Sequence, residues 1–141
     1  MADTLADPQY LPLVVVGAHL SGAPLNHELT GCGALLAGPV RTAPCYRLYA
    51  LRTDPAKPGL VRVLSDGRHI EGEKWLLPPH ALGFFLAALP APMALGRIAL
   101  EDGTSCTGFL CEPYVLAEAV DITHHGGWRA YLSALNQGAS A

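Results

Sequence analysis

The sequence predicts a mixed α+β domain built on a mostly antiparallel sheet, and it leaves open whether that sheet closes into a small barrel. Two regions have the pattern of a β-hairpin, in which two short apolar or alternating runs flank an Asp-Gly turn. Runs with helical spacing of apolar residues lie between and after these regions. The 141 residues contain no internal repeat and no long linker. We therefore expect one domain over residues 1–141, with a flexible arm at 1–10 and a mobile tail at 136–141.

The first element is a short β-branched run, Val14–Val16, which predicts a buried strand. The run stops at Gly17, and Gly22 closes the turn that follows. Between these glycines lie two polar side chains, His19 and Ser21. Loops held by a rigid strand commonly carry binding and catalytic groups. This loop is therefore the first candidate for a functional site.

A helix is expected directly after the loop. Pro24 suits a first helical turn, and Leu25, Leu29 and Leu35 recur at roughly helical spacing. The N–H groups at the start of this helix would face the loop and attract an anion. The pair Gly38-Pro39 predicts a turn after the helix.

The middle of the chain predicts strands. Cys45–Leu51 alternates well enough for one strand, and the proline-containing segment Asp54–Gly59 that follows predicts a loop. A first hairpin is expected from Leu60–Leu64 and His69–Leu77 around Asp66-Gly67.

The last third of the chain alternates helices with the second hairpin. Pro78-Pro79 ends the preceding strand and begins a helix with an apolar stripe. The expected elements are a helix at His80–Leu89 with its stripe at Leu82, Phe85, Leu86 and Leu89, strands at Gly96–Leu100 and Thr104–Cys111, a short helical stretch at Pro113–Ala119 and a helix at Trp128–Leu135.

Composition limits the classes of partner. Half of the residues are apolar and 15% are charged, as expected for a globular chain. The net charge is −3 and the nine Lys and Arg are scattered, so we expect neither nucleic acid nor a membrane as partner. No apolar run approaches the roughly 20 residues of a spanning helix. Met1–Pro8 has no basic segment typical of a secretory signal, so we predict a cytoplasmic protein.

The sequence gives no sign of a metal site or a cofactor site. Its four cysteines do not form the close Cys-x-x-Cys pairs of zinc sites, and we expect reduced, packing side chains. His124 and His125 would point to opposite faces of a strand, with no carboxylate or cysteine at ligand spacing. Asp121 is expected to pair with Arg129 or to cap local backbone. The cysteines are Cys32, Cys45, Cys106 and Cys111.

Three stretches together resemble one known family. They are Val-Val-Gly-Ala-His-Leu-Ser-Gly-Ala-Pro-Leu-Asn at 15–26, the segment 41–60 with Arg-Thr-Ala-Pro, Tyr-Arg-Leu-Tyr-Ala-Leu and Lys-Pro-Gly-Leu, and the segment 108–132 with Gly-Phe-Leu-Cys-Glu, Asp-Ile-Thr and Gly-Gly-Trp-Arg-Ala-Tyr-Leu. Over Pro12–Leu135 the chain resembles the carboxy-terminal domain of allophanate hydrolase, an enzyme of urea breakdown.

This resemblance implies a fold similar to that of the γ-glutamylcyclotransferases, a small β-barrel flanked by helices, with the site in the loop after the first strand. It also implies that the domain decarboxylates N-carboxycarbamate, the product of an amidase domain. This chain has no room for an amidase domain, so a separately encoded amidase is the expected partner. Cyclotransferases carry a glutamate base in a segment that corresponds here to 90–95, which contains no acid.

His19 and Glu73 are the catalytic candidates. On the resemblance, His19 is the histidine of the decarboxylase site, and its side chain suits proton transfer near neutral pH. The alternative is a histidine that caps the turn. Glu73 shares a strand face with Trp75, and a desolvated carboxylate beside an aromatic ring often has a raised pKa. It would then act as an acid, unless it is an exposed strand residue.

The expected ligand is a small carboxylate or carbamate anion. Loop amides, the Asn26 side chain and the Lys57 ammonium are the donors that would receive it. Asn26 could instead cap the first turn, Lys57 could be solvated, and core packing is the alternative for Tyr49. The predicted binding residues are Gly17, Ala18, Leu20, Asn26, Tyr49 and Lys57.

Three functions remain open from the sequence. The first is an anion-binding decarboxylase. The second is a non-catalytic subunit that docks on the amidase, which an exposed apolar patch would favour. The third is a cyclotransferase-like enzyme acting on an amino-acid amine, with Glu73 as base. The sequence leaves open whether the chain forms a homodimer.

Overall fold

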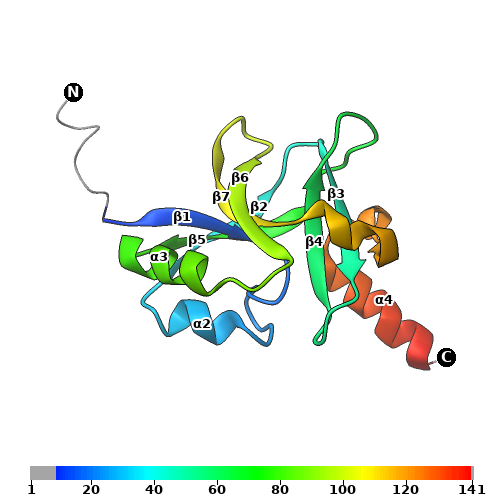
Figure 1. Cartoon of the computed structure of the whole chain (residues 1–141), viewed down its shortest axis with the longest axis horizontal. Helices are drawn as coiled ribbons and strands as arrows, with labels where there is room; N and C mark the ends of the chain where they lie inside the picture. The colour runs from blue at the N-terminus through cyan, green and yellow to red at the C-terminus, as the bar shows by residue number, and fades with distance from the viewer. Residues whose placement is uncertain (1–8, 141) are drawn as a thin grey trace.

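The computed structural model describes residues 9–140, which form two β-sheets with helices packed around them (Figure 1). The first sheet has the strand order β2-β5-β1-β7-β6, and the second has the order β4-β3-β8. The strands are β1 (Leu11–Val15), β2 (Leu35–Arg41), β3 (Tyr46–Leu51), β4 (Lys57–Arg62), β5 (Glu71–Leu77), β6 (Met93–Ala99), β7 (Ser105–Cys111) and β8 (Val120–Asp121). The helices are α2 (Asn26–Thr30), α3 (Pro79–Ala88) and α4 (Trp128–Ser140), with 3₁₀ turns η1 (Pro113–Glu118) and η2 (Thr123–His125).

Strand β1 is the centre of the larger sheet. It pairs antiparallel with β5 on one side and parallel with β7 on the other. Leu13, Val14 and Val15 are fully buried, as expected for a strand covered on both faces. Val16 lies just beyond the end of β1 and is also buried. The strand predicted from the valine run is therefore confirmed.

The second predicted hairpin is also confirmed. Strands β6 and β7 pair antiparallel over their whole length, from Met93 opposite Cys111 to Ala99 opposite Ser105. The short helical stretch after β7 is the 3₁₀ turn η1.

The predicted helix through Leu35 and the predicted turn at Gly38-Pro39 are wrong. Helix α2 ends at Thr30, and Leu35 begins β2, which contains both Gly38 and Pro39. The strand tolerates them because it is the edge strand of the sheet, where a proline without an N–H leaves no ladder bond unmade. A shift in register between Leu36 and Gly38 marks a β-bulge.

The predicted hairpin of Leu60–Leu64 with His69–Leu77 is wrong as well. Strand β4 pairs with β3, whereas β5 pairs with β1 and β2 in the other sheet. The turn at Asp66 and Gly67 therefore carries the chain from one sheet to the other. The strand predicted over Cys45–Leu51 is confirmed as β3, but the predicted loop ends early, because β4 already begins at Lys57.

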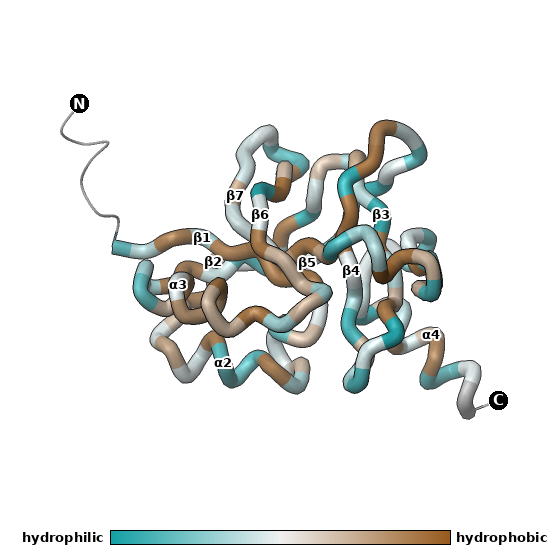
Figure 2. Tube along the Cα trace, viewed as in Figure 1, coloured by the Kyte–Doolittle hydropathy of each residue, from teal (hydrophilic) through white to brown (hydrophobic). Residues whose placement is uncertain are grey.

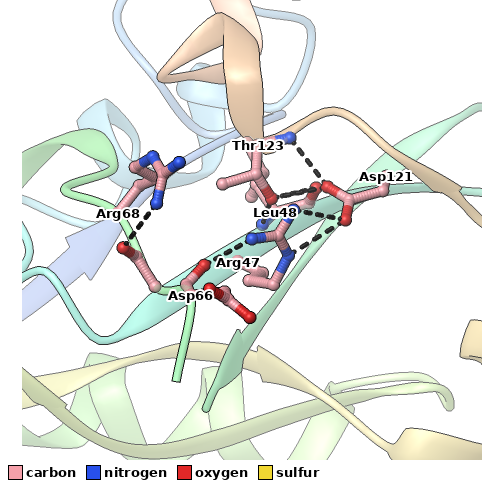
Figure 3. A network of polar contacts seen from close by, with 7 residues as sticks. Arg47, Leu48, Asp66, Arg68, Asp121 and Thr123 are labelled. Carbon is pink, nitrogen blue, oxygen red and sulfur yellow. Dashed lines mark hydrogen bonds and ion pairs between the residues drawn. The ribbon is translucent and has the colours of Figure 1, made fainter. Parts of the chain in front are cut away.

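A polar network joins the smaller sheet to η2 (Figure 3). Arg47 of β3 donates to Oδ2 of Asp121 from Nε at 2.9 Å and from a terminal nitrogen at 2.7 Å, and it also donates to the carbonyl of Asp66. Oδ1 of Asp121 accepts from the backbone N–H and the hydroxyl of Thr123. Local capping by Asp121 is thus confirmed, but its predicted pairing with Arg129 is wrong, because β3 places Arg47 beside it.

Two predicted helices are confirmed with changes. Helix α3 buries Ala81, while Phe84 and Leu86 on it are 72% and 60% exposed, so Leu86 does not belong to a buried stripe. Helix α4 begins at Trp128 as expected but continues to Ser140, through most of the predicted tail. Apolar residues dominate β1 and α3, whereas α4 mixes both kinds (Figure 2).

The predicted barrel is not confirmed. Strands β4 and β7 approach closely, since a Cβ built on Gly59 would lie 2.7 Å from the sulfur of Cys111, but no ladder joins them within residues 9–140. No helix in this part of the chain is long and apolar enough to cross a membrane. Most of the predicted flexible arm, residues 1–8, lies outside the described residues.

Candidate functional site

A cavity of about 700 Å³ opens beside the loop that follows β1. The loop contributes Gly17, Ala18 and His19, and the start of β4 contributes Lys57. Most of the remaining lining is apolar. It includes Leu25, Pro58, Phe84, Phe85, Met93 and Phe109.

The loop is held in shape by its own hydrogen bonds. Leu20 N–H donates to the carbonyl of Gly17 at 3.0 Å, and Leu25 N–H donates to the carbonyl of Ala18 at 2.8 Å. The side-chain amide of Asn26 donates to the carbonyl of His19 at 3.0 Å. The N–H groups of Ala18 and His19 donate to no group within residues 9–140, so they remain available to a ligand.

His19 lies between aromatic rings and a carboxylate. Its ring stacks on Phe109 with centroids 5.0 Å apart, and it meets Phe85 edge-on at 5.5 Å. Nε2 of His19 is 2.7 Å from Oε1 of Glu28, and a carboxylate partner there favours the tautomer with the proton on Nε2. Burial lowers the pKa of His19 below 6.5, and Lys57 adds to this, against the opposing effect of Glu28. The ring is therefore mainly neutral at pH 7.

The second ring nitrogen of His19 is free to react. Nδ1 has no hydrogen-bond partner among residues 9–140, and no side-chain nitrogen or oxygen sealed from solvent there lacks one. Nδ1 therefore remains accessible to solvent. A histidine with one nitrogen on a carboxylate and the other accessible can take up and pass on a proton.

Lys57 provides the positive charge of this cavity. It is the one lysine or arginine that lines it within the described part of the chain. Lys57 opens β4, opposite Leu51 of β3, so a sheet and not a free loop holds its backbone. The next residue, Pro58, packs directly against Gly17.

Glu73 does not join His19. It lines a second cavity of about 440 Å³, which Leu20 and Arg129 also line. Burial by itself raises the pKa of Glu73, but hydrogen bonds from Ser21, Trp75 and Arg129 outweigh burial, and the pKa lies below 4.5. The expected raised pKa is therefore wrong. An ionised carboxylate engaged in this way is unsuited to act as the predicted acid.

The structure thus separates the predicted site residues. Gly17, Ala18, His19 and Lys57 line one cavity, and Leu20 and Glu73 line the other. Asn26 bonds to the carbonyl of His19, and Tyr49 pairs with Gly59 and Asp121 in the smaller sheet; neither lines either of these two cavities.

Sequence reasoning missed the partners of His19. Glu28 stands nine residues after it on α2, and Phe85 and Phe109 come from α3 and β7. No local motif links positions so far apart. The apolar spacing around Phe85 and the alternation around Phe109 indicated packing and nothing more specific.

The part of the chain that the structure describes contains no cluster of potential metal ligands. No group of three or more His, Cys, Asp or Glu side chains suited to a metal ion occurs within residues 9–140. The expected strand placement of His124 and His125 is wrong, because both lie in η2 and their ring centroids are 4.1 Å apart. All four cysteines are free, as expected.

Comparison with known proteins gives consistent relatives. The chain is 39% identical over 145 residues to the urea amidolyase of Saccharomyces cerevisiae, an alignment that covers 96% of this chain and 8% of that protein. The urea amidolyase of Lachancea kluyveri matches with the same identity and coverage. The chain therefore spans about one twelfth of the length of these curated relatives.

Solved structures agree. An allophanate hydrolase from Kluyveromyces lactis superposes with a TM-score of 0.85 at 37% identity, covering 89% of this chain and 21% of that one. A uropathogenic E. coli-specific protein gives a TM-score of 0.83 at 32% identity and covers 89% of this chain and 98% of its own. An AIG2-like protein from Mus musculus, at 17% identity and a TM-score of 0.63, shares the fold.

The family model that matches is that of the allophanate hydrolase C-terminal domain, over residues 11–133. This range contains both β-sheets, the His19 loop and the start of α4. The chain belongs to the allophanate hydrolase C-terminal domain family.

Proposed function

We propose that this chain binds a small carboxylate or carbamate anion at the His19 loop and decarboxylates N-carboxycarbamate in the breakdown of urea through allophanate. One observation carries the proposal: Lys57, His19 with its accessible ring nitrogen, and Ala18, whose N–H like that of His19 has no partner among residues 9–140, all line the same cavity. Lysine and directed N–H donors are the groups that receive a carboxylate.

The roles of the donors differ. Lys57 would attract the anion, and the N–H groups of Ala18 and His19 would orient one carboxylate. The apolar walls formed by Phe85 and Phe109 would exclude water and so strengthen each of these interactions. The cavity has no need of a cofactor for this chemistry.

The reaction requires one proton. When CO2 leaves N-carboxycarbamate, the bond between nitrogen and one carboxylate carbon breaks, and its electron pair stays on nitrogen. The nitrogen takes up a proton, and carbamate remains. His19 would first take up a proton from solvent at Nδ1, forming an imidazolium that Glu28 stabilises at Nε2, and would then pass the Nδ1 proton to the nitrogen and return to the neutral ring.

The substrate would come from an amidase. The segments that match in the curated relatives belong to much longer proteins named urea amidolyase, so a separately encoded amidase is the partner we propose for this chain. The γ-glutamylcyclotransferase-like barrel and a cytoplasmic location both fit this function and stay predictions.

The test adds the purified chain to an amidase half that lacks its own carboxy-terminal domain. With allophanate present, the release of CO2 and the release of ammonia are followed separately. We expect faster CO2 release at an unchanged rate of the amidase reaction. Equal CO2 release with and without the chain would overturn the proposed decarboxylation.

The second candidate function is that of a non-catalytic subunit docked on the amidase. It is favoured by two large apolar side chains that helix α4 exposes outside the His19 cavity, Leu132 at 39% and Leu135 at 51%. Co-elution with the amidase half in size-exclusion chromatography, without any change in CO2 release, would select this function over the first.

A further inference from the structure

Glu73 holds the far end of the His19 loop. Its Oε1 accepts a hydrogen bond from the backbone N–H of Ser21 at 2.7 Å and another from the Ser21 hydroxyl at 3.0 Å. The indole N–H of Trp75 donates to the same oxygen at 3.2 Å. Glu73 is 8% exposed, so these donors satisfy a carboxylate that has little access to water.

Arg129 of helix α4 also bonds to the same loop. One of its terminal nitrogens donates to the carbonyl of Ser21 at 2.6 Å and lies 3.3 Å from Oε2 of Glu73. Ser21 is thus held at its N–H, its hydroxyl and its carbonyl by two residues that stand 52 and 108 positions further along the chain. Such a fully engaged residue fixes the backbone on both sides of it.

The location of this contact links it to His19. Glu73 stands directly opposite Val15 in the β1–β5 ladder, at the point where β1 ends and the loop begins. The loop is therefore tied to β5 at its start through the ladder and at Ser21 through the carboxylate. His19 lies between these two ties, two residues before Ser21.

The contact of Glu73 and Arg129 with Ser21 lies beside the second cavity and not beside the cavity of His19. Glu73 and Arg129 line the second cavity, together with Trp128, and none of the three lines the cavity of His19. Neither charged side chain can therefore touch an anion bound at His19. Any effect they have on that anion must pass through Ser21 and the loop backbone.

We propose that Glu73 and Arg129 are positioning residues, which fix the His19 loop through Ser21 and so set the direction of the His19 ring and of the loop N–H groups. This inference rests on the proposed function of that loop. A displacement of a reacting group by about 1 Å is enough to cost a large factor in rate. We call this contact of Glu73 and Arg129 with Ser21 the anchor. It connects helix α4 to the proposed site at His19.

The test uses two substitutions and two matched controls. Arg129→Ala removes a side chain that is 56% exposed, so the fold is expected to persist. Glu73→Gln puts an amide where Arg129 needs an acceptor and weakens the charge-assisted bonds from Ser21. Arg52→Ala is the control for the arginine, because Arg52 also donates to a backbone carbonyl, that of Glu118. Glu71→Gln is the control for the glutamate, at an exposed position of the same strand.

The first readout needs no ligand. In NMR spectra we would follow the hydrogen exchange of the Ser21 amide and the ring nitrogen shifts of His19. Loss of one charge-assisted hydrogen bond predicts at least about tenfold faster exchange of the Ser21 amide and a shift of the His19 signals. A purely structural role would lower the melting temperature and leave the His19 signals of the folded protein unchanged.

The second readout is binding of malonate, a stable dicarboxylate of similar size and charge to N-carboxycarbamate. We expect roughly tenfold weaker binding in Arg129→Ala and in Glu73→Gln, and wild-type binding in both controls. Wild-type Ser21 and His19 signals in the two variants would overturn the inference. A wild-type chain that neither binds malonate nor releases CO2 would overturn the proposed function, and the ligand-free signals would still decide the role of the anchor.

Discussion

Pro58 occupies the space that any side chain on Gly17 would need. A Cβ built on Gly17 would lie 2.2 Å from Cγ of Pro58 and 2.4 Å from Cδ. A proline ring cannot rotate away, since it is closed on its own backbone. Gly17 begins the His19 loop and Pro58 follows Lys57 in β4, so this contact sets the spacing between the loop and the lysine.

Gly17→Ala should therefore push the loop away from β4. We expect the free energy of unfolding to fall by about 1–3 kcal/mol, as for other overpacked sites, and malonate binding to weaken. Urea denaturation and titration calorimetry would measure the two effects. Gly83→Ala is the control: no atom lies within 4 Å of its would-be Cβ, and alanine within a helix is expected to add about 0.5–1 kcal/mol. Equal stability of the two variants would contradict the tight contact at Gly17.

His19→Ala should remove the proton donor without changing the fold. General acid catalysis is worth about 10²–10⁴ in rate, and we expect a loss of that order in CO2 release while ammonia release by the amidase continues. His27→Ala is the matched control, because His27 lies on the neighbouring helix and bonds to the carbonyl of Pro24 outside the cavity. Equal rates of CO2 release in the two variants would refute the role given to His19.

His19 should also make stability depend on pH. Burial holds its folded-state pKa below 6.5, so the unfolded chain binds more protons than the folded chain between that lowered pKa and 6.5. Stability linked to His19 is therefore complete above pH 6.5 and is lost as the pH falls below it. Urea denaturation of the wild type and of His19→Gln at about pH 7.5 and about pH 5.5 isolates this contribution. The wild type should lose more stability than the variant, and a parallel loss would contradict the burial of the ring.

The elements that sequence predicted correctly are those whose pattern is local. The valines of β1 form a buried run, and the β6–β7 hairpin and α3 have their turn, proline and spacing signals within a few residues. The pairing of β4 with β3 could not be predicted from a local pattern. The Asp66-Gly67 turn suggests a hairpin, but Leu60 pairs with Leu48, and only tertiary packing decides between the two sheets.

The candidate site follows the same division. His19, Ala18 and Lys57 belong to recognisable motifs, and the structure brings them to one cavity. The roles of Glu73 and Arg129 depend on a contact across 56 positions, and nothing in either local sequence encodes it. Glu73 beside Trp75 suggested a carboxylate in an apolar environment with a raised pKa. Hydrogen-bond donors from the loop and from α4 lower the pKa of Glu73 instead.

Thr123 offers a test of the polar network in the smaller sheet. Its hydroxyl accepts a hydrogen bond from the N–H of Leu48 at 2.9 Å and donates to Oδ1 of Asp121 at 2.6 Å (Figure 3). Thr123 is 2% exposed and Leu48 is fully buried. Valine has nearly the same shape but no hydroxyl, so Thr123→Val would leave the Leu48 N–H buried without its acceptor.

We expect Thr123→Val to lower the free energy of unfolding by about 1–3 kcal/mol, the cost of a buried donor left unpaired. Thr123→Ser keeps the hydroxyl and should lose only about 1 kcal/mol, from one buried methyl group. Thr104→Val, at an exposed threonine that bonds to Asp102, should change stability by less than about 0.5 kcal/mol. Urea denaturation of the three variants gives the comparison. Should Thr123→Val prove as stable as Thr123→Ser, the hydroxyl would not be what joins η2 to β3, and the packing of the methyl group against the sheet would have to explain the connection.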